Sequence, residues 1–170
     1  ISSDLNVLRR SIFSNLSIHL KKNQDRGYGD LSFFEIGPTF FGKNPGEQQI
    51  VVGGLKSGQV YRRSWSDKSR NVDVFDVKSD ALRTLVELGI DENNLFISDL
   101  TKCTYHPGRS GSINLKSDKG PHLAYFGELH PAILKKLDFK DKNVFGFEIF
   151  LTNVPKQNKK AREVKVNYTV

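Results

Sequence analysis

Apolar residues recur every three or four positions near the start of the chain, which predicts an amphipathic helix. We expect this helix to span residues 4–22, with Ser3 or Asp4 as its N-cap. The segment Asp25-Arg26-Gly27-Tyr28-Gly29 then ends it. The stripe is wider than one packing face needs, so part of it is expected to contact a partner. The stripe consists of Leu5, Leu8, Ile12, Phe13, Leu16, Ile18 and Leu20.

Short apolar runs separated by turn residues predict several strands in the rest of the chain. The adjacent Phe33 and Phe34 indicate a strand buried on both faces, and Gly37-Pro38 bends the chain after it. Turns are expected at 43–46 and, as a hairpin loop, at 117–120. The predicted strands are 31–36, 39–41, 49–55, 72–77, 95–100, 110–115, 122–126 and 144–151.

Two further helices are expected between these strands. Ser79 is placed to cap a helix over 80–88 that Gly89 closes, and Pro131 begins a short helix that reaches Leu137. A doubly wound parallel sheet would need a helix after nearly every strand. Many strands with few short helices instead predict an α+β fold, a mostly antiparallel sheet with helices on one side.

Composition indicates a globular domain that is part of a longer protein. The chain has 170 residues, no Met, and begins inside a helix-start pattern. Its single Cys103 excludes an internal disulfide and a cysteine-based zinc site. No apolar run approaches the length of a membrane span, and no signal-peptide pattern is present, so we expect a cytoplasmic protein.

Positive charge is concentrated at the end of the chain. Residues 155–170 contain five Lys or Arg and a single acid, Glu163, so this short segment carries more than half of the net charge of +7. We expect residues 1–154 to form the folded domain and 155–170 to be a basic linker that begins the next one. A solvated tether is the simpler interpretation, and contact with RNA phosphates is the alternative. The candidate RNA contacts are Lys156, Lys159, Lys160 and Arg162.

Three short blocks occur in a fixed order along the chain. They are Phe33-Phe34-Glu35-Ile36-Gly37, His106-Pro107-Gly108-Arg109-Ser110 and Phe126-Gly127-Glu128-Leu129-His130-Pro131. Together they resemble the β subunit of bacterial phenylalanyl-tRNA synthetase. The segment Ile1–Ile12 is similar to that family's P-(I/L)-S-x-(D/E)-x-x-x-L-R-x-S-L start. The resemblance extends from Ser2 to about Pro155.

The resemblance implies a class II synthetase-like domain that has lost its active site. It implies the α subunit as partner in an α2β2 heterotetramer that joins phenylalanine to tRNA(Phe), with ATP and Mg²⁺ bound elsewhere. The basic linker would then lead to an anticodon-binding-like domain. The first helix is similar to the class II dimerisation motif, which implies a subunit interface. The implied interface residues are Leu5, Leu8, Arg9, Arg10, Ile12, Phe13 and Leu16.

Catalytic chemistry of the class II type is missing from the sequence. Two arginines must grip the ATP phosphates, yet no Arg-x-Glu motif occurs, and Phe145-Gly146-Phe147-Glu148 carries an acid where a cation is needed. We therefore expect no catalytic residues, no bound cofactor and no metal. The alternative is an active biotin- or lipoate-type ligase or synthetase paralogue on the same fold, with Val52-Gly53-Gly54-Leu55-Lys56 as its phosphate site. A module that binds RNA through the basic tail alone lacks interleaved aromatic residues except Tyr168.

The remaining conspicuous residues have structural interpretations. His106, Pro107, Gly108 and Arg109 predict a shaped turn in which Gly108 adopts a left-handed conformation, with substrate or RNA contact as the alternative. Gly127, Glu128, His130 and Pro131 predict a strand-to-helix junction, because two potential ligands are too few for a metal. Arg9 and Arg10 lie about 100° apart on a helix, so at least one is expected to pair with an acid across a subunit or domain contact.

Overall fold

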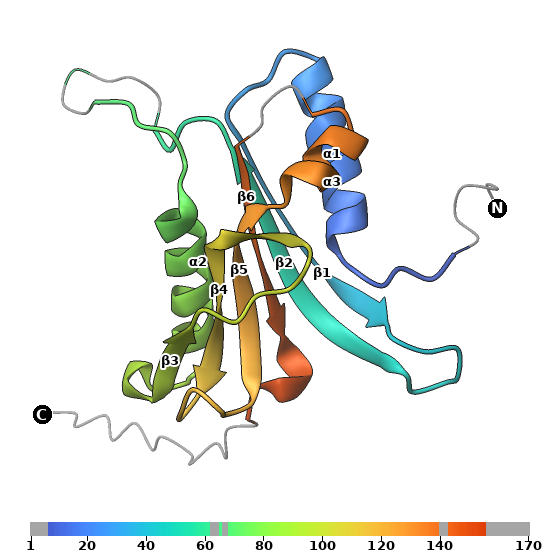
Figure 1. Ribbon diagram of the computed structural model, residues 1–170, viewed down its shortest axis with the longest axis vertical. Coiled ribbons are helices and arrows are strands. Elements are labelled where there is room, and N and C mark those ends of the chain that lie inside the picture. The colour runs from blue at the N-terminus through green and yellow to red at the C-terminus, as the bar shows by residue number, and fades with distance from the viewer. Residues whose placement is uncertain (1–6, 62–64, 66–67, 140–142, 156–170) are drawn as a thin grey trace, which may run out of the picture.

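Six strands form a single antiparallel sheet in the order β1-β2-β6-β5-β4-β3. The computed structural model describes residues 7–61, 65, 68–139 and 143–155 (Figure 1). Each neighbouring pair of strands is antiparallel, which confirms the predicted sheet type. The strands are β1 (Leu31–Phe40), β2 (Gln48–Ser57), β3 (Leu95–Ser98), β4 (Tyr105–Leu115), β5 (His122–Leu129) and β6 (Val144–Phe150).

Helices cover both faces of the sheet rather than one. Adjacent strand residues point to opposite faces, and Val51 and Val52 accordingly enter different cores. Val52 lies in the core under α2, whereas Val51 lies in the core under α1 and α3 (Figure 1). The prediction of helices on one side was therefore wrong. The helices are α1 (Phe13–Asp25), α2 (Val74–Glu87) and α3 (Pro131–Lys136), with 3-10 turns η2 (Glu92–Asn94) and η3 (Leu151–Asn153).

The first helix begins at Phe13, nine residues later than the sequence pattern predicts. The carbonyl of Arg9 accepts a hydrogen bond of 2.9 Å from the Phe40 amide, which ties this segment to β1. A backbone held by the edge strand cannot also make helical hydrogen bonds, so the apolar periodicity extends beyond the helix. Ser3 and Asp4 lie outside the described residues. The predicted end is confirmed, because α1 stops at Asp25 and Gly27 has φ +92°.

The second helix begins at Val74, where the sequence pattern predicted a strand. Asp73 is its N-cap and accepts hydrogen bonds from the Phe75 and Asp76 amides, while Asp76 bonds back to the Asp73 amide. This capping box fixes the start of α2, so both the strand over 72–77 and the cap at Ser79 were wrong. Gly89 closes the helix with φ +88°, as predicted.

The first strand is an edge strand, and β2 is its single strand neighbour within the described part of the chain. It continues through Gly37-Pro38 without ending, because proline is tolerated where the outer side of a strand is unpaired. Phe34 is 76% exposed, so the expected burial on both faces is wrong. The far part of the β1–β2 hairpin extends away from the body of the molecule (Figure 1).

Candidate functional site

The first sequence block forms a clamp between the N-terminal segment and β1. The Arg9 guanidinium pairs with the Glu35 carboxylate, and its Nε donates a hydrogen bond of 2.8 Å to the Pro38 carbonyl. The guanidinium passes over Gly37, where any Cβ would collide with it. Arg9 therefore pairs within the chain, and the expected pairing across a subunit or domain contact stays a prediction for Arg10. Arg10 is exposed.

The second and third blocks lie side by side on β4 and β5. Ser110 is in register with Gly127, and Arg109 Nε lies 2.9 Å from Glu128 Oε2. Glu128 is only 3% exposed. Gly127 has φ +154°, and a Cβ there would lie 2.7 Å from Ser110 Cα and 2.8 Å from the Arg109 carbonyl oxygen. This close approach requires glycine and brings the two blocks together.

The predicted left-handed turn at Gly108 is wrong. Gly108 has no positive φ and belongs to β4, which carries a register shift between Tyr105 and Ser110. A Cβ at Gly108 would approach only the His106 ring, at an ordinary 3.7 Å. The Gly108 amide donates a hydrogen bond of 3.1 Å to His106 Nδ1. The irregularity is this register shift, which accommodates Pro107 without a left-handed residue.

His130 and Pro131 connect β5 to α3. The His130 Nδ1 atom accepts a hydrogen bond of 3.1 Å from the Ala132 amide and so acts as the N-cap of α3. Pro131 occupies the first helical turn, where its missing amide hydrogen leaves no bond unmade. Glu128 pairs with Arg109 and His130 caps the helix, so the two groups weighed as metal ligands have other partners.

A pocket of about 650 Å³ opens beside the Arg109–Glu128 pair. Its walls come from β4, from the end of β5, from α3 and from described residues that follow α3 in the chain. The lining residues are Arg109, Glu128, Pro131, Leu134, Lys135, Asp138, Phe139 and Asn143. The pocket combines one buried carboxylate with apolar walls, an arrangement suited to a small ligand.

The acid at the end of the last strand is buried in a polar cluster. Glu148 is 3% exposed, accepts a hydrogen bond of 2.9 Å from Ser11 and lies 3.8 Å from Lys102 Nζ. Lys102 also lies over the Tyr125 and Phe150 rings, 4.6 and 4.2 Å from their centroids. Burial lowers the pKa of Lys102 although the nearby carboxylate opposes this shift. Ser11 and Lys102 therefore tie distant segments to β6, and Glu148 places an acid where a phosphate would need a cation.

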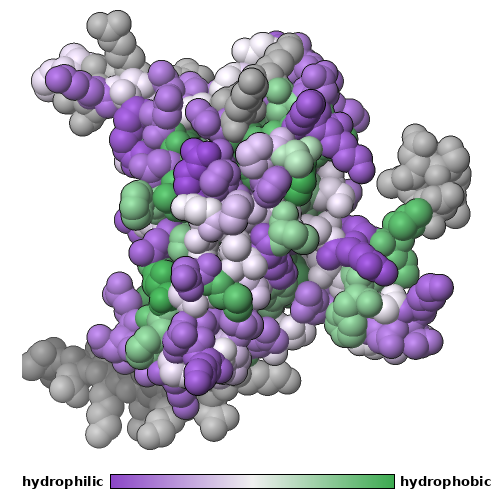
Figure 2. Space-filling view, in the orientation of Figure 1, coloured by the Kyte–Doolittle hydropathy of each residue, from purple (hydrophilic) through white to green (hydrophobic). Residues whose placement is uncertain are grey.

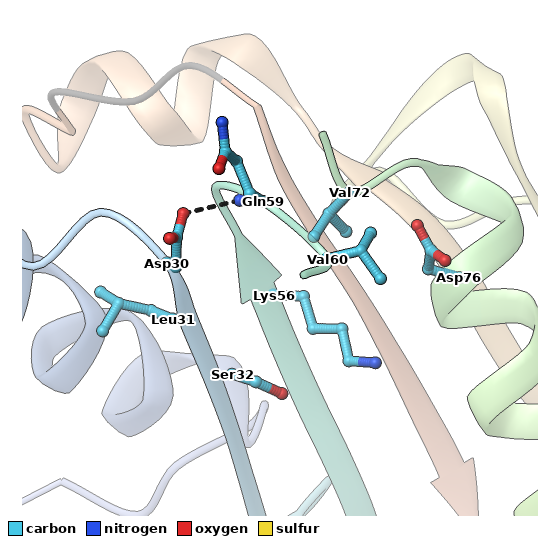
Figure 3. A pocket seen from close by; sticks show the side chains of 8 residues that line it. All are labelled: Asp30, Leu31, Ser32, Lys56, Gln59, Val60, Val72 and Asp76. Atoms are coloured by element: carbon cyan, nitrogen blue, oxygen red, sulfur yellow. Dashed lines mark hydrogen bonds between the residues drawn. The ribbon is translucent and has the colours of Figure 1, made fainter. Parts of the chain in front are cut away.

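The proposed phosphate site of an active ligase is occupied by acids. Lys56 Nζ lies 2.5 Å from the Asp80 carboxylate. The pocket beside it holds about 240 Å³ and contains Asp30 and Asp76 (Figure 3). Asp30 accepts a hydrogen bond from the Gln59 amide and Asp76 pairs with Arg70, so the charges of this pocket serve the fold. Such a pocket repels phosphate.

The two glycines before Lys56 serve packing rather than ligand binding. A Cβ at Gly53 would collide with the Ile12 side chain, and one at Gly54 would lie 2.5 Å from the Phe147 ring. The missing side chain of Gly53 leaves room for Ile12 in the core under α1, and that of Gly54 leaves room for Phe147 in the core under α2. Nothing in the described part of Val52–Lys56 resembles a loop that cradles phosphates.

The residues predicted to form a subunit interface fall into two groups. Ile12, Phe13 and Leu16 are at most 4% exposed and belong to the core under α1, so a partner cannot reach them. That part of the interface prediction was wrong, because the side of α1 that carries them packs on β1 and β2. Leu8 and Ile18 remain 58% and 50% exposed.

Some predicted residues lie outside the part of the chain that the structure describes: Leu5, Lys156, Lys159, Lys160 and Arg162. Within the described ranges, no cluster of three or more His, Cys, Asp or Glu side chains is placed to hold a metal ion. No described helix has both the length and the apolar composition that crossing a membrane requires.

The sheet and its helices match a solved tRNA synthetase. The pyrrolysyl tRNA synthetase PylSc of Desulfitobacterium hafniense superposes with a TM-score of 0.60 over 86% of this chain and 48% of its own, at 16% identity. The likeness concerns the fold alone. The fold is that of the class II aminoacyl-tRNA synthetases.

Sequence comparison narrows this class to one family. The model of the phenylalanyl tRNA synthetase beta chain CLM domain matches residues 1–151, and the chain belongs to this family. The phenylalanine–tRNA ligase beta subunit of Paramagnetospirillum magneticum is 42% identical over 165 residues, which cover 97% of this chain. That of Rhodospirillum rubrum is 44% identical over 155 residues, or 91% of this chain. The chain spans about a fifth of the length of these relatives.

Proposed function

We propose that this chain is a non-catalytic module of a phenylalanine–tRNA ligase that packs against the catalytic α subunit. Its relatives carry the name of that enzyme's beta subunit, and the chain belongs to their CLM domain family. In the α2β2 enzyme, ATP, Mg²⁺ and phenylalanine bind elsewhere, and tRNA(Phe) contacts other parts. The module contributes the scaffold on which the α subunit is held.

One observation carries the proposal: an apolar surface surrounds the free edge of the sheet. We call it the β1 surface, and it consists of Phe34, Ile36, Phe41 and Ile50, which are 76%, 59%, 63% and 38% exposed. Ile36 pairs with Val52 and Phe34 with Gly54, so both point to the face that α2 covers farther along the sheet. Figure 2 shows hydrophobic side chains on this arm of the molecule.

An uncovered surface of this kind predicts a protein partner. The edge strand is ten residues long, and among the described residues its outer side pairs with no other strand, although the Phe40 amide and the Pro38 carbonyl bond to Arg9. Long, apolar, unpaired edges cause aggregation in soluble proteins unless another element covers them. Val7 and Leu8 are 81% and 58% exposed, and their segment is bonded to the end of β1. They add exposed apolar side chains at this edge of the sheet.

The charges around the sheet support a role without ATP. Arg9, Arg109 and Lys56 each pair with a carboxylate of this chain, and Glu148 is buried in the last strand. A phosphate would have to displace a carboxylate from each cation and approach further acids. These contacts favour a supporting module over the active ligase that the sequence left as an alternative.

Co-purification with the α subunit tests the proposal. Phe34→Thr removes the most exposed ring of the β1 surface but keeps a residue that favours strands. We expect the variant to fold and to lose about tenfold or more in affinity, as at the centre of other interfaces. Phe96→Thr is the matched control, because Phe96 is 43% exposed on the opposite edge strand, β3. Equal capture of both variants at wild-type level would contradict the proposed surface.

A further inference from the structure

The pocket beside the Arg109–Glu128 pair has no role in the proposed packing against the α subunit. It lies at the junction of β4, β5 and α3, whereas the β1 surface lies at the far edge of the sheet. We infer that this pocket binds a small organic cation: an ammonium group carried on an apolar body.

The buried carboxylate sets the charge of the ligand. The Glu128 side chain is 4% exposed, and its Oε2 atom lies 2.9 Å from Arg109 Nε. Despite this short distance, Oε2 accepts no hydrogen bond of good geometry among the described residues. A buried carboxylate with an incomplete set of donors attracts a further N–H group, and a charged donor gives the strongest hydrogen bond.

Arg109 is the partner that can give way. Its side chain is 54% exposed, so its guanidinium can turn into water at little cost once a ligand cation replaces it. The converse exchange is unfavourable, because an anion that drew Arg109 away would leave Glu128 buried without a counter-charge. The asymmetry in burial therefore selects cations and rejects anions.

The other walls set the body of the ligand. Pro131, Leu134 and Phe139 line the pocket, and its volume of about 650 Å³ lies within the range of small-molecule sites. Lys135 and Asp138 stand at the rim and are both exposed, so water weakens the effect of their charges on a bound ligand without abolishing it. An aryl or alkyl group next to the ammonium would contact the apolar wall while the charge reaches Glu128.

The ligand class is tested by titrating the full chain with three probes of similar shape. The probes are phenethylamine, 2-phenylethanol and hydrocinnamate, which are a cation, a neutral alcohol and an anion. We expect saturable one-to-one binding of the amine, with affinity at least about tenfold above that of the alcohol and no binding of the anion. Equal affinity for amine and alcohol, or no saturation by the amine, overturns the assignment.

Two variants connect the binding to the pocket. Glu128→Gln keeps the shape of the side chain and should reduce the preference for the amine about tenfold. Because Glu128 is buried, a second variant leaves it intact: Lys135→Gln removes an exposed rim cation and should tighten amine binding by about two- to threefold. Amine binding that neither variant changes places the ligand elsewhere and contradicts the inference.

Discussion

One basic residue in each of three conspicuous sequence segments pairs with a carboxylate of the same chain, and this pairing decides what each can do. Arg9 pairs with Glu35, Arg109 with Glu128, and Lys56 with Asp80. A cation already paired at short range gains less from a phosphate than a free one does. At the scale of single residues, the family's motifs therefore serve the architecture, with the Arg109 pair also facing a pocket.

We predict that the stability of the fold requires glycine at position 127 but not at position 108. Gly127→Ala should lower the free energy of unfolding by about 1–3 kcal/mol, because the new Cβ meets the backbone at Arg109 and Ser110. Gly108→Ala is the control and should stay within about 0.5 kcal/mol, since only the His106 ring lies near. Urea denaturation midpoints compare the two. Similar midpoints for both variants would refute the close-approach argument.

These two glycines show where residue patterns are informative. The Pro-Gly sequence at 107–108 predicts a turn. In the structure these residues belong to β4, which pairs with β5 on both sides of a register shift. Nothing in Phe126-Gly127-Glu128 distinguishes Gly127 locally, since its constraint comes from Ser110 on another strand. The pairing of Ser11 and Lys102 with Glu148 is likewise set by tertiary structure and leaves no pattern in the sequence.

The sequence predicts the presence of most helices and strands better than it predicts the residues at which they begin and end. Strands β2, β5 and β6 match the predicted apolar runs, and α3 begins at the predicted Pro131. The start of α1 is displaced because the Arg9 backbone is bonded to β1. The spacing of Asp73 and Asp76 is typical of a capping box and indicates where α2 begins. The apolar residues within 72–77 instead favoured a strand.

The capping box of α2 gives a prediction about pH. The hydrogen bond from Arg70 is the main cause that lowers the pKa of Asp76 below its usual value of 3.8. The folded state therefore binds this proton less readily than the unfolded state, so the stabilisation is complete above about pH 4 and is lost as pH falls further. Asp76→Asn should destabilise the chain at pH 7 by about 1 kcal/mol and flatten this acid loss. Thermal denaturation from pH 7 to pH 3 measures both effects.

Lys78→Gln is the control for that series, because Lys78 lies on the same helix outside the capping box. It should keep the acid-dependent loss of the parent chain. If Asp76→Asn retains the same slope between pH 4 and pH 3, other carboxylates carry the acid sensitivity and the assignment to Asp76 is wrong.

At the scale of the molecule, we expect that this class II synthetase sheet does not bind ATP. We predict that calorimetry of the full chain with ATP and Mg²⁺ detects no stoichiometric binding tighter than about millimolar, the weak end of specific affinities. The physical reason is the set of acids beside Lys56 and the buried Glu148. Tighter one-to-one binding would favour the active-ligase alternative.

Hydrogen–deuterium exchange of the chain, alone and saturated with the α subunit, tests the packing proposal most directly. We predict slower exchange of the outward-facing β1 amides and of residues 7–18, where Val7, Leu8 and Ile18 are exposed in the free chain. Exchange in β3, on the opposite edge, should be unchanged. A complex that protects β3 while β1 exchanges at its free rate would contradict the proposed packing of β1 against the α subunit.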